Sequence, residues 1–281
     1  MPTSLTLVTG KGGVGKSAVA AALALSARRQ GQRVLAIDMT NGGGLGAHLG
    51  EPDLTFEPRP IGIGLEASVI DRADALIEYL RVQIGLPALA TMGPAARAFD
   101  ALASTAPAVR EVVTIGKVLW EVRREVWDLV VADGPPTGQI GSYLRAARTI
   151  RELVSTGRIL DQVEWMEDIL TDPERTHLSI VTLLEELPAV ESAETLAWVR
   201  AEEVIGSISV IANRVLPPLG AKVPDGAGPV AETAALHHDL WQDQQEWADY
   251  LEVDRSLPYL FGTYTPPEVG ERLSDALEEG T

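Results

Sequence analysis

The sequence contains no cysteine and no long apolar run. Without thiols the chain can form no disulfide, carry no iron–sulfur cluster and hold no zinc through cysteine. No stretch of about 18 consecutive apolar residues occurs, so no membrane-spanning helix is expected. The first strand is predicted to begin within a few residues of Met1, without the charged and then apolar pattern of a signal peptide. We therefore expect a soluble, cytoplasmic protein with no stable membrane insertion.

Positive charge is also scarce. The chain has 23 Lys and Arg against 40 Asp and Glu, which gives a net charge of −17 and an isoelectric point near 4.6. Nucleic acids and anionic membranes bind basic faces, so neither is an expected partner. Residues 266–281 have an apolar face opposite an acidic one, unlike a basic amphipathic membrane anchor. Of only four lysines, two fall in one glycine-rich stretch, residues 10–17.

Residues 4–17, SLTLVTGKGGVGKS, combine a short apolar strand with the spacing G-x-x-x-x-G-K-[ST]. In this motif backbone N–H groups surround a phosphate chain, the lysine contacts the β- and γ-phosphates, and the hydroxyl binds Mg²⁺. The alanine-rich helix predicted over residues 18–29 adds its dipole to the anion site. The alternative is a glycine-rich turn without a ligand. The expected nucleotide contacts are Gly10, Gly12, Gly13, Val14, Gly15, Lys16, Ser17 and Ala18.

A second lysine, Lys11, directly follows Gly10. Lys16 can serve the nucleotide of its own chain, whereas a lysine at the outer edge of the loop would point toward a facing subunit. We therefore expect two catalytic cations, Lys16 in cis and Lys11 in trans.

Two aspartates end apolar strands. The strand predicted over residues 33–38 closes in Asp38, and WDLVVAD over residues 127–133 closes in Asp133. Because ligands gather at the carboxyl edge of a parallel sheet, both carboxylates should lie beside the phosphate loop. We predict that Ser17 and Asp133 hold Mg²⁺, and that Asp38 orients the attacking water or contacts Mg²⁺ through water. For Asp38 the alternative is a helix cap or a turn aspartate.

The rest of the chain predicts alternating strands and helices. Residues 40–50 hold so many glycines that we expect a mobile switch loop rather than a packed element. A helix over residues 230–251 is predicted to bury Leu240, Trp247 and Leu251. Three histidines, His48, His237 and His238, are expected to face solvent. Other predicted elements are a strand at 65–71, helices at 72–85, 107–126 and 139–170, and a short helix between Pro87 and Pro107.

The phosphate loop with Lys11 resembles that of the deviant Walker A ATPases, which include MinD, ParA, the nitrogenase iron protein and ArsA. The stretch DGPPTGQ, residues 133–139, resembles the switch II loop of the ArsA and tail-anchored-protein targeting ATPases. The chain is thus identified as a short ArsA-like member. The resemblance implies that Asn213 binds adenine, for which its amide is suited. A turn-forming asparagine is the alternative. The resemblance also implies that residues 255–270 approach the adenine, without selecting a contact.

The departures from the family pattern matter as well. Switch I of the family usually has the pattern D-P-A-[HR], but Asp38 is followed by MTNGG. The Cys-x-x-Cys zinc clamp of the eukaryotic targeting ATPases is absent, and four methionines cannot line a methionine-rich client groove. The candidate client segments form a helical subdomain, residues 85–106 and 139–170, and their apolar spacing is also that of an ordinary core.

These observations predict a three-layer α/β P-loop NTPase fold, a mostly parallel sheet flanked by helices, in a single domain over residues 1–281. The predicted activity is Mg²⁺-dependent binding and hydrolysis of ATP by a nucleotide-gated dimer, for protein targeting or for anion or metalloid handling. The second subunit would be identical or a paralogous ATPase, and a protein client is a candidate partner. The alternatives are an ATP-binding pseudoenzyme or regulatory subunit, and a MinD- or ParA-like positioning ATPase.

Overall fold

The computed structural model describes residues 2–82, 109–153, 158–220 and 228–279. The described strands form one sheet in the order β3-β4-β2-β5-β1-β6-β7-β8. The edge pair β3–β4 is antiparallel, and every other neighbouring pair is parallel. The strands are β1 Ser4–Gly10, β2 Val34–Asp38, β3 Arg59–Gly62, β4 Leu65–Val69, β5 Leu129–Pro136, β6 Thr176–Thr182, β7 Ser207–Val215 and β8 Arg255–Pro258.

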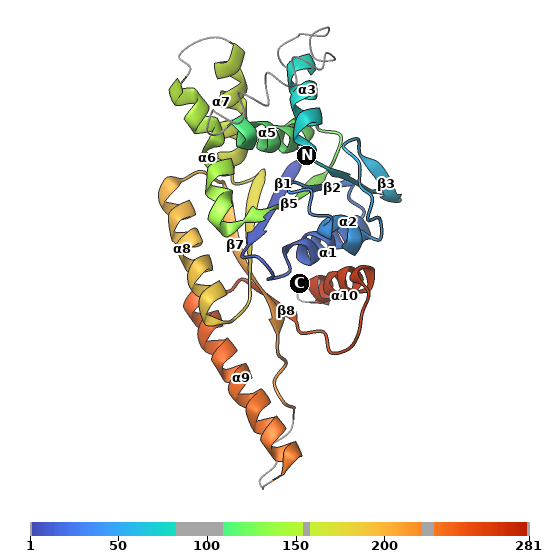
Figure 1. The fold of residues 1–281 in the computed structure, drawn as a ribbon, viewed down its shortest axis with the longest axis vertical. Coiled ribbons are helices and arrows are strands. Elements are labelled where there is room, and N and C mark those ends of the chain that lie inside the picture. The colour runs from blue at the N-terminus through green and yellow to red at the C-terminus, as the bar shows by residue number, and fades with distance from the viewer. Residues whose placement is uncertain (1, 83–108, 154–157, 221–227, 280–281) are drawn as a thin grey trace.

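Helices cover both faces of this sheet (Figure 1). Apolar side chains of the central strands alternate between two buried clusters, because successive residues of a strand point to opposite faces. In β2, for example, Leu35 and Ile37 join one cluster while Val34 and Ala36 join the other. The predicted three-layer α/β fold is confirmed. The helices are α1 Lys16–Arg29, α2 Gly44–Leu49, α3 Arg72–Val82, α5 Val109–Arg123, α6 Thr137–Leu153, α7 Arg158–Thr171, α8 Glu186–Glu202, α9 Pro229–Leu251 and α10 Pro266–Glu279.

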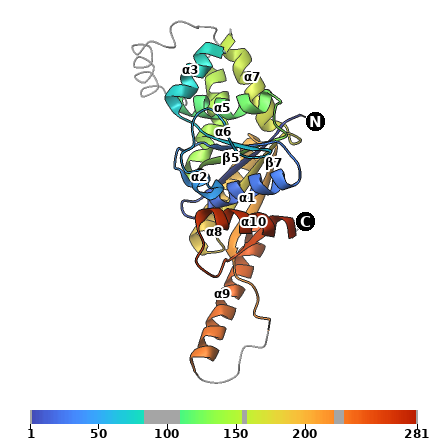
Figure 2. The ribbon, with the colours of Figure 1, turned by 90° about the vertical axis from the view of Figure 1, so that its right-hand side faces the viewer.

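The two ends of the molecule differ. Figures 1 and 2 show α3, α5, α6 and α7 gathered at one end and α9 reaching out from the other. The predicted segment 85–106 lies entirely outside the described residues, which stop at the end of α3 and resume at the start of α5. The described residues of segment 139–170 form the helices α6 and α7, and Val163, Met166 and Ile169 are buried in the core. These apolar residues therefore match the core alternative. None of the described helices combines the length and the hydropathy of a membrane span.

Residues 40–50 are not a glycine-rich loop throughout, so that prediction was wrong. They contain the short helix α2, whose Leu45 is fully buried. The glycines allow close packing: a Cβ on Gly44 would lie 2.6 Å from Ser17 Oγ, and one on Gly46 would lie 2.4 Å from the Glu51 carbonyl oxygen. Glycine here brings α2 against the phosphate loop and does not indicate mobility.

Helix α9 is less buried than its pattern predicted. Of the predicted core residues, Leu251 is buried and Trp247 packs partly against the core, but Leu240 is 46% exposed. Leu251 is the one buried residue of this helix, whose first half extends away from the sheet (Figure 1). The regularly spaced apolar residues of α9 therefore lie partly on an exposed face and partly on a buried one.

Candidate functional site

The phosphate loop connects β1 to α1 and depends on two tightly enclosed glycines. A Cβ on Gly10 would lie 2.1 Å from the Val181 carbonyl oxygen of β6. Gly15 has a positive φ of 93°, and a Cβ there would lie 2.4 Å from Asn213 Nδ2 at the end of β7. Both contacts exclude side chains at these positions, so neighbouring strands fix the path of the loop.

Lys16, the first residue of α1, folds its side chain back along the loop. Its Nζ donates a hydrogen bond to the Lys11 carbonyl oxygen at 3.2 Å. Burial lowers the pKa of Lys16 from its ordinary value, while the negative charge of Asp133 acts in the opposite direction. The ammonium thus lies at the mouth of a loop of backbone N–H groups, the arrangement that binds phosphates.

Asp38 and Asp133 occupy neighbouring positions on β2 and β5, where their Cα atoms are register partners. Both are almost fully buried, at 1% and 3% exposure. Burial raises the pKa of Asp133 to about 6; a hydrogen bond from Ser17 lowers it, Asp38 raises it further, and Lys16 lowers it. No described residue donates to Asp133 Oδ1. A buried, unpartnered carboxylate oxygen beside a hydroxyl fits a hydrated Mg²⁺ ion, so Ser17 and Asp133 suit the predicted metal role.

The carboxylate of Asp38 holds the chain that leads into α2. Oδ1 accepts hydrogen bonds from the backbone N–H of Thr40 at 2.9 Å and from its hydroxyl at 3.0 Å, and Oδ2 accepts from the N–H of Gly43 at 3.0 Å. These contacts are those of a turn aspartate, which is the alternative given above for Asp38. The carboxylate still lies next to Asp133, and its role in orienting water stays a prediction.

The first residues of switch II are part of β5. The strand runs to Pro136, and Gly10 pairs with Pro136 across the sheet. The hydroxyl of Thr9 donates to the Pro135 carbonyl oxygen at 2.7 Å. Phosphate loop and switch II are therefore joined by hydrogen bonds at the centre of the sheet.

Lys11 is turned toward α8. Its Nζ lies 2.7 Å from Glu191 Oε1, and both side chains are partly exposed. No local pattern marks Glu191, because its partner is 180 positions away in the sequence. Strand β6 lies beside β1 in the sheet. The helix that follows β6, α8, therefore brings Glu191 next to Lys11 in the phosphate loop.

Asn213 braces the phosphate loop from the side. Its Nδ2 donates to the Val14 carbonyl oxygen at 2.9 Å, and its Oδ1 accepts from the N–H of Arg214 at 3.0 Å. The side chain is buried against Gly15. One amide hydrogen and one lone pair remain for a ligand, so the adenine role of Asn213 stays a prediction.

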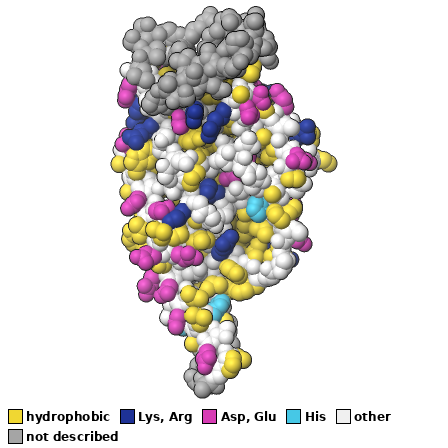
Figure 3. All heavy atoms as spheres, viewed as in Figure 1, with side chains coloured by type: hydrophobic (Ala, Val, Ile, Leu, Met, Phe, Trp, Pro, Cys, Tyr) yellow, Lys and Arg dark blue, Asp and Glu magenta, His cyan; other side chains and the backbone are white. Residues whose placement is uncertain are grey.

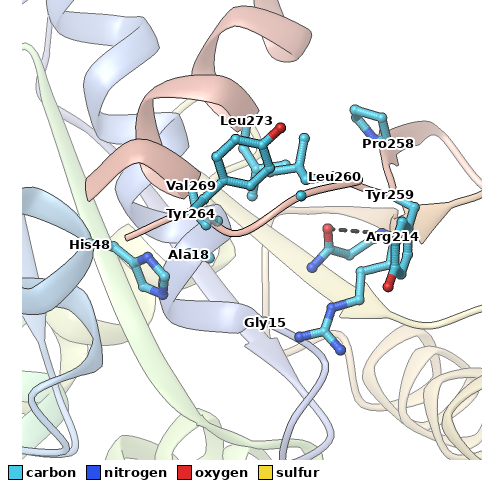
Figure 4. Close-up of a pocket in the computed structure, with 12 residues that line it drawn as sticks. Gly15, Ala18, His48, Arg214, Pro258, Tyr259, Leu260, Tyr264, Val269 and Leu273 are labelled. Atoms are coloured by element: carbon cyan, nitrogen blue, oxygen red, sulfur yellow. Dashed lines mark hydrogen bonds between the residues drawn. The ribbon is translucent and has the colours of Figure 1, made fainter. Parts of the chain in front are cut away.

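A cavity of about 450 Å³ opens beside Gly15 and Asn213. Figure 4 shows Arg214 and Tyr259 on one side of it and Tyr264 and Val269 on the other. An aromatic and aliphatic wall of this kind suits the faces of a nucleobase. His48 lies at its rim, with Nδ1 2.8 Å from the Pro266 carbonyl oxygen. The cavity is lined by Gly15, Ala18, His48, Asn213, Arg214, Pro258, Tyr259, Leu260, Gly262, Tyr264, Val269 and Leu273.

Comparison with known proteins agrees with this geometry. A sequence model of the anion-transporting ATPase family matches residues 3–156, which include the phosphate loop, Asp38 and Asp133. ATPase BagA of Mycobacterium tuberculosis is 34% identical over 225 residues, covering 76% of this chain and 65% of BagA. A Halobacterium salinarum protein named "Putative arsenical pump-driving ATPase" is 26% identical over 236 residues, covering 76% of this chain and 36% of that protein. The chain thus matches less than two thirds of the length of these relatives. It belongs to the ArsA family of anion-transporting ATPases.

Proposed function

We propose that this ArsA-family chain binds Mg-ATP, hydrolyses it slowly and works as a nucleotide-gated switch. The observation that supports this most is the joint placement of Lys16, Ser17 and the unpartnered Asp133 oxygen at the mouth of one phosphate loop. The adjoining cavity offers a place for the base. Phosphate, metal and base sites then lie along one edge of the sheet, as expected for a parallel α/β fold.

Each group has a distinct role in this proposal. Lys16 and the loop N–H groups bind the β- and γ-phosphates, and Ser17 and Asp133 hold the cation. Bound Mg²⁺ would neutralise charge on the phosphates. Asp38 orients the attacking water. The base lies between Tyr259 and Tyr264, with Asn213 at its edge.

Lys11 extends the proposal to a second subunit. The chain has one phosphate loop. The Lys16 side chain turns back along this loop, whereas the Lys11 ammonium contacts Glu191 of α8. We propose that closure of a dimer separates Lys11 from Glu191 and directs it to the γ-phosphate of the facing subunit. The partner is an identical chain or a paralogous ATPase.

A protein client is favoured over a metalloid. Arsenite-like ions are soft and bind thiolates, and the sequence has no cysteine. The described residues contain no group of three or more His, Asp or Glu side chains that could hold a metal ion. Of the two relatives described above, pump driving is part of the name of the Halobacterium protein, and ATPase BagA is named for ATPase activity alone.

Phosphate release tests the activity directly. The purified chain should release phosphate from ATP with Mg²⁺ and stop with EDTA, and Lys16→Ala should abolish both release and calorimetric ATP binding. Undiminished ATP affinity in this variant would contradict the phosphate-loop assignment.

The second candidate function is a regulatory ATP-binding switch with little turnover. It is favoured by the three hydrogen bonds that occupy the Asp38 carboxylate. Comparison of the dissociation constant for ATP with the turnover number separates the two. Tight binding with a turnover no different from that of Lys16→Ala would favour the switch.

A further inference from the structure

His48 is the residue through which helix α2 reaches the base cavity. Of the residues that line this cavity, it is the one that belongs to α2, and its side chain is partly buried. Figure 4 shows its ring across the cavity from Arg214 and Tyr259, and Figure 3 shows histidine side chains in cyan on the same face of the molecule. The roles proposed above for the nucleotide contacts do not include this histidine.

The hydrogen bond to Pro266 fixes the neutral form of the ring. His48 Nδ1 lies 2.8 Å from the Pro266 carbonyl oxygen. A carbonyl oxygen can only accept a hydrogen bond, so Nδ1 carries a proton and donates it. In a neutral imidazole the other nitrogen then has a free lone pair. His48 Nε2 is therefore a hydrogen-bond acceptor at the cavity.

Close packing holds the backbone around this acceptor in place. A Cβ on Gly270 of α10 would lie 2.7 Å from the His48 carbonyl oxygen, so α10 lies directly against α2. At the other end of α2, Gly44 is packed against Ser17 of the phosphate loop. The position of His48 is thus fixed relative to both the phosphate loop and α10. An acceptor that is already in place loses little conformational entropy when a ligand binds, which favours a binding role.

The acceptor has no partner within the described part of the chain. No described residue forms a hydrogen bond with His48 Nε2. Across the cavity, Arg214 offers donors only, and Asn213 Oδ1 already accepts from the Arg214 N–H. The lining of this cavity includes no Asp or Glu among the described residues. A neutral histidine therefore supplies an acceptor here without the negative charge that would repel a phosphate chain.

The chemistry of the acceptor indicates which part of a nucleotide it fits. Phosphate oxygens are acceptors and cannot pair with it. The nucleoside has donors in two places, the exocyclic amino group of adenine and the hydroxyls of the sugar. We propose that His48 Nε2 accepts a hydrogen bond from one of these nucleoside donors and thereby contributes to nucleotide specificity. This inference rests on the proposed function and adds a specificity-determining residue to it.

NMR of the nucleotide-free chain tests the tautomer without reference to ATP binding. Long-range ¹H–¹⁵N spectra distinguish the protonated ring nitrogen from the unprotonated one at about pH 9, where an imidazole is ordinarily neutral. Comparison with the variant His48→Asn identifies the His48 signals. The proton is expected on Nδ1, and a proton on Nε2 would overturn the proposal.

Two variants separate the acceptor from the contact with Pro266. His48→Asn places an amide nitrogen at the position of Nδ1, which can still donate to Pro266, but it has no atom at the position of Nε2. His48→Gln places an amide oxygen near the position of Nε2 and gives up the bond to Pro266. Calorimetric ATP affinity should fall about three- to tenfold in His48→Asn and recover in part in His48→Gln. Pyrophosphate, which lacks a nucleoside, should bind all three chains equally, and equal thermal melting shows that their fold is intact.

Nucleotide analogues identify the donor. The probes are 2′-deoxy-ATP, 3′-deoxy-ATP and purine riboside triphosphate, each of which lacks one sugar hydroxyl or the amino group of the base. The analogue without the donor that His48 binds should have about three- to tenfold lower affinity than ATP for the wild type. This difference should disappear in His48→Asn, because the variant has already lost the same hydrogen bond. The analogue concerned shows whether the base or the sugar is bound.

Two calorimetric results would overturn this inference alone. One is that His48→Asn leaves the affinity ratio of ATP to each analogue unchanged. The other is that pyrophosphate affinity falls as much as ATP affinity, since His48 would then act only by holding α2. Either result leaves the proposed function intact if ATP binding still depends on Lys16. A wild-type chain that binds no ATP would contradict the proposed function and this inference together.

Discussion

The phosphate end and the base end of this site lie on the same sheet edge but are built differently. At the phosphate end, β1, β2 and β5 bury Asp38 and Asp133, and neighbouring strands leave no room for side chains at Gly10 and Gly15. At the base end, beyond β7 and β8, Tyr259 and Phe261 are 44% and 58% exposed around two cavities. A charged phosphate is bound best by hydrogen-bond donors that are held in fixed positions. The apolar face of a base or helix can instead be bound by a partly exposed wall of apolar side chains.

The largest expected effect on turnover with ATP binding retained is that of Lys11→Ala, at the phosphate end. A cation supplied on closure contributes about 10³ to 10⁵ in rate, so turnover should fall by at least about 10³-fold while a monomer still binds ATP. Phosphate release and calorimetry measure the two quantities. Lys16→Ala is the matched control, because it should lose binding as well.

Mixing variants tests whether Lys11 acts in trans. In a heterodimer of Lys11→Ala and Asp38→Asn chains, the site with an intact Asp38 receives Lys11 from its neighbour, so partial activity should return. A confirmed heterodimer without activity would show that Lys11 does not act across the interface. A failure of both chains to associate would favour a paralogous partner.

The second effect is that of Asp38→Asn, which keeps the size of the side chain but removes its basicity. ATP binding should survive while turnover falls by about 10²-fold. Thr40→Val is the control: it removes the hydroxyl that donates to Asp38 at 3.0 Å and keeps the carboxylate. If both variants lose turnover equally, Asp38 acts by holding the loop before α2 and not on the water.

The third effect concerns Gly15, because this residue of the phosphate end lies directly against Asn213 of the base end. Gly15→Ala places a methyl group 2.4 Å from Asn213 Nδ2 at a φ of 93°, and the left-handed backbone alone costs about 1–2 kcal/mol. Lower melting temperature and weaker ATP binding are expected. Gly12→Ala is the control, since a Cβ there meets nothing within 4 Å and should leave the melting temperature unchanged.

A double variant then measures the coupling between the ends. Asn213→Ala removes the atom that the methyl group would strike, so it should recover part of the stability lost in Gly15→Ala. Simple additivity of the two losses in free energy of unfolding would mean that Asn213 does not brace the phosphate loop.

The same contrast explains what the sequence could predict. The phosphate end consists of short sequence motifs: Lys16 and Ser17 are adjacent, and Asp38 and Asp133 each follow a run of apolar residues, so the local pattern predicted that all four lie near one another. The strand of Asp133 continues beyond the predicted end, to Pro136. The partner of Lys11 could not be found this way, because Glu191 reaches it only through the folded sheet. Leu240 was assigned to the core because helical periodicity shows that a face is apolar but not what covers it.

The smallest expected effect is at the base end, where Tyr259→Ala should weaken ATP and ADP equally by about tenfold. Loss of one aromatic contact with a base is worth about 1–3 kcal/mol, and the open wall places this residue at the lower limit. Pyrophosphate, which lacks a base, should bind as in the wild type. Phe261→Ala is the matched control, since Phe261 lines the neighbouring groove beside α9 but not the base cavity, so it should leave ATP binding unchanged. If Phe261→Ala weakened ATP binding as much as Tyr259→Ala does, the cavity and the neighbouring groove would be one site, and the assignment of the base to the cavity alone would fail.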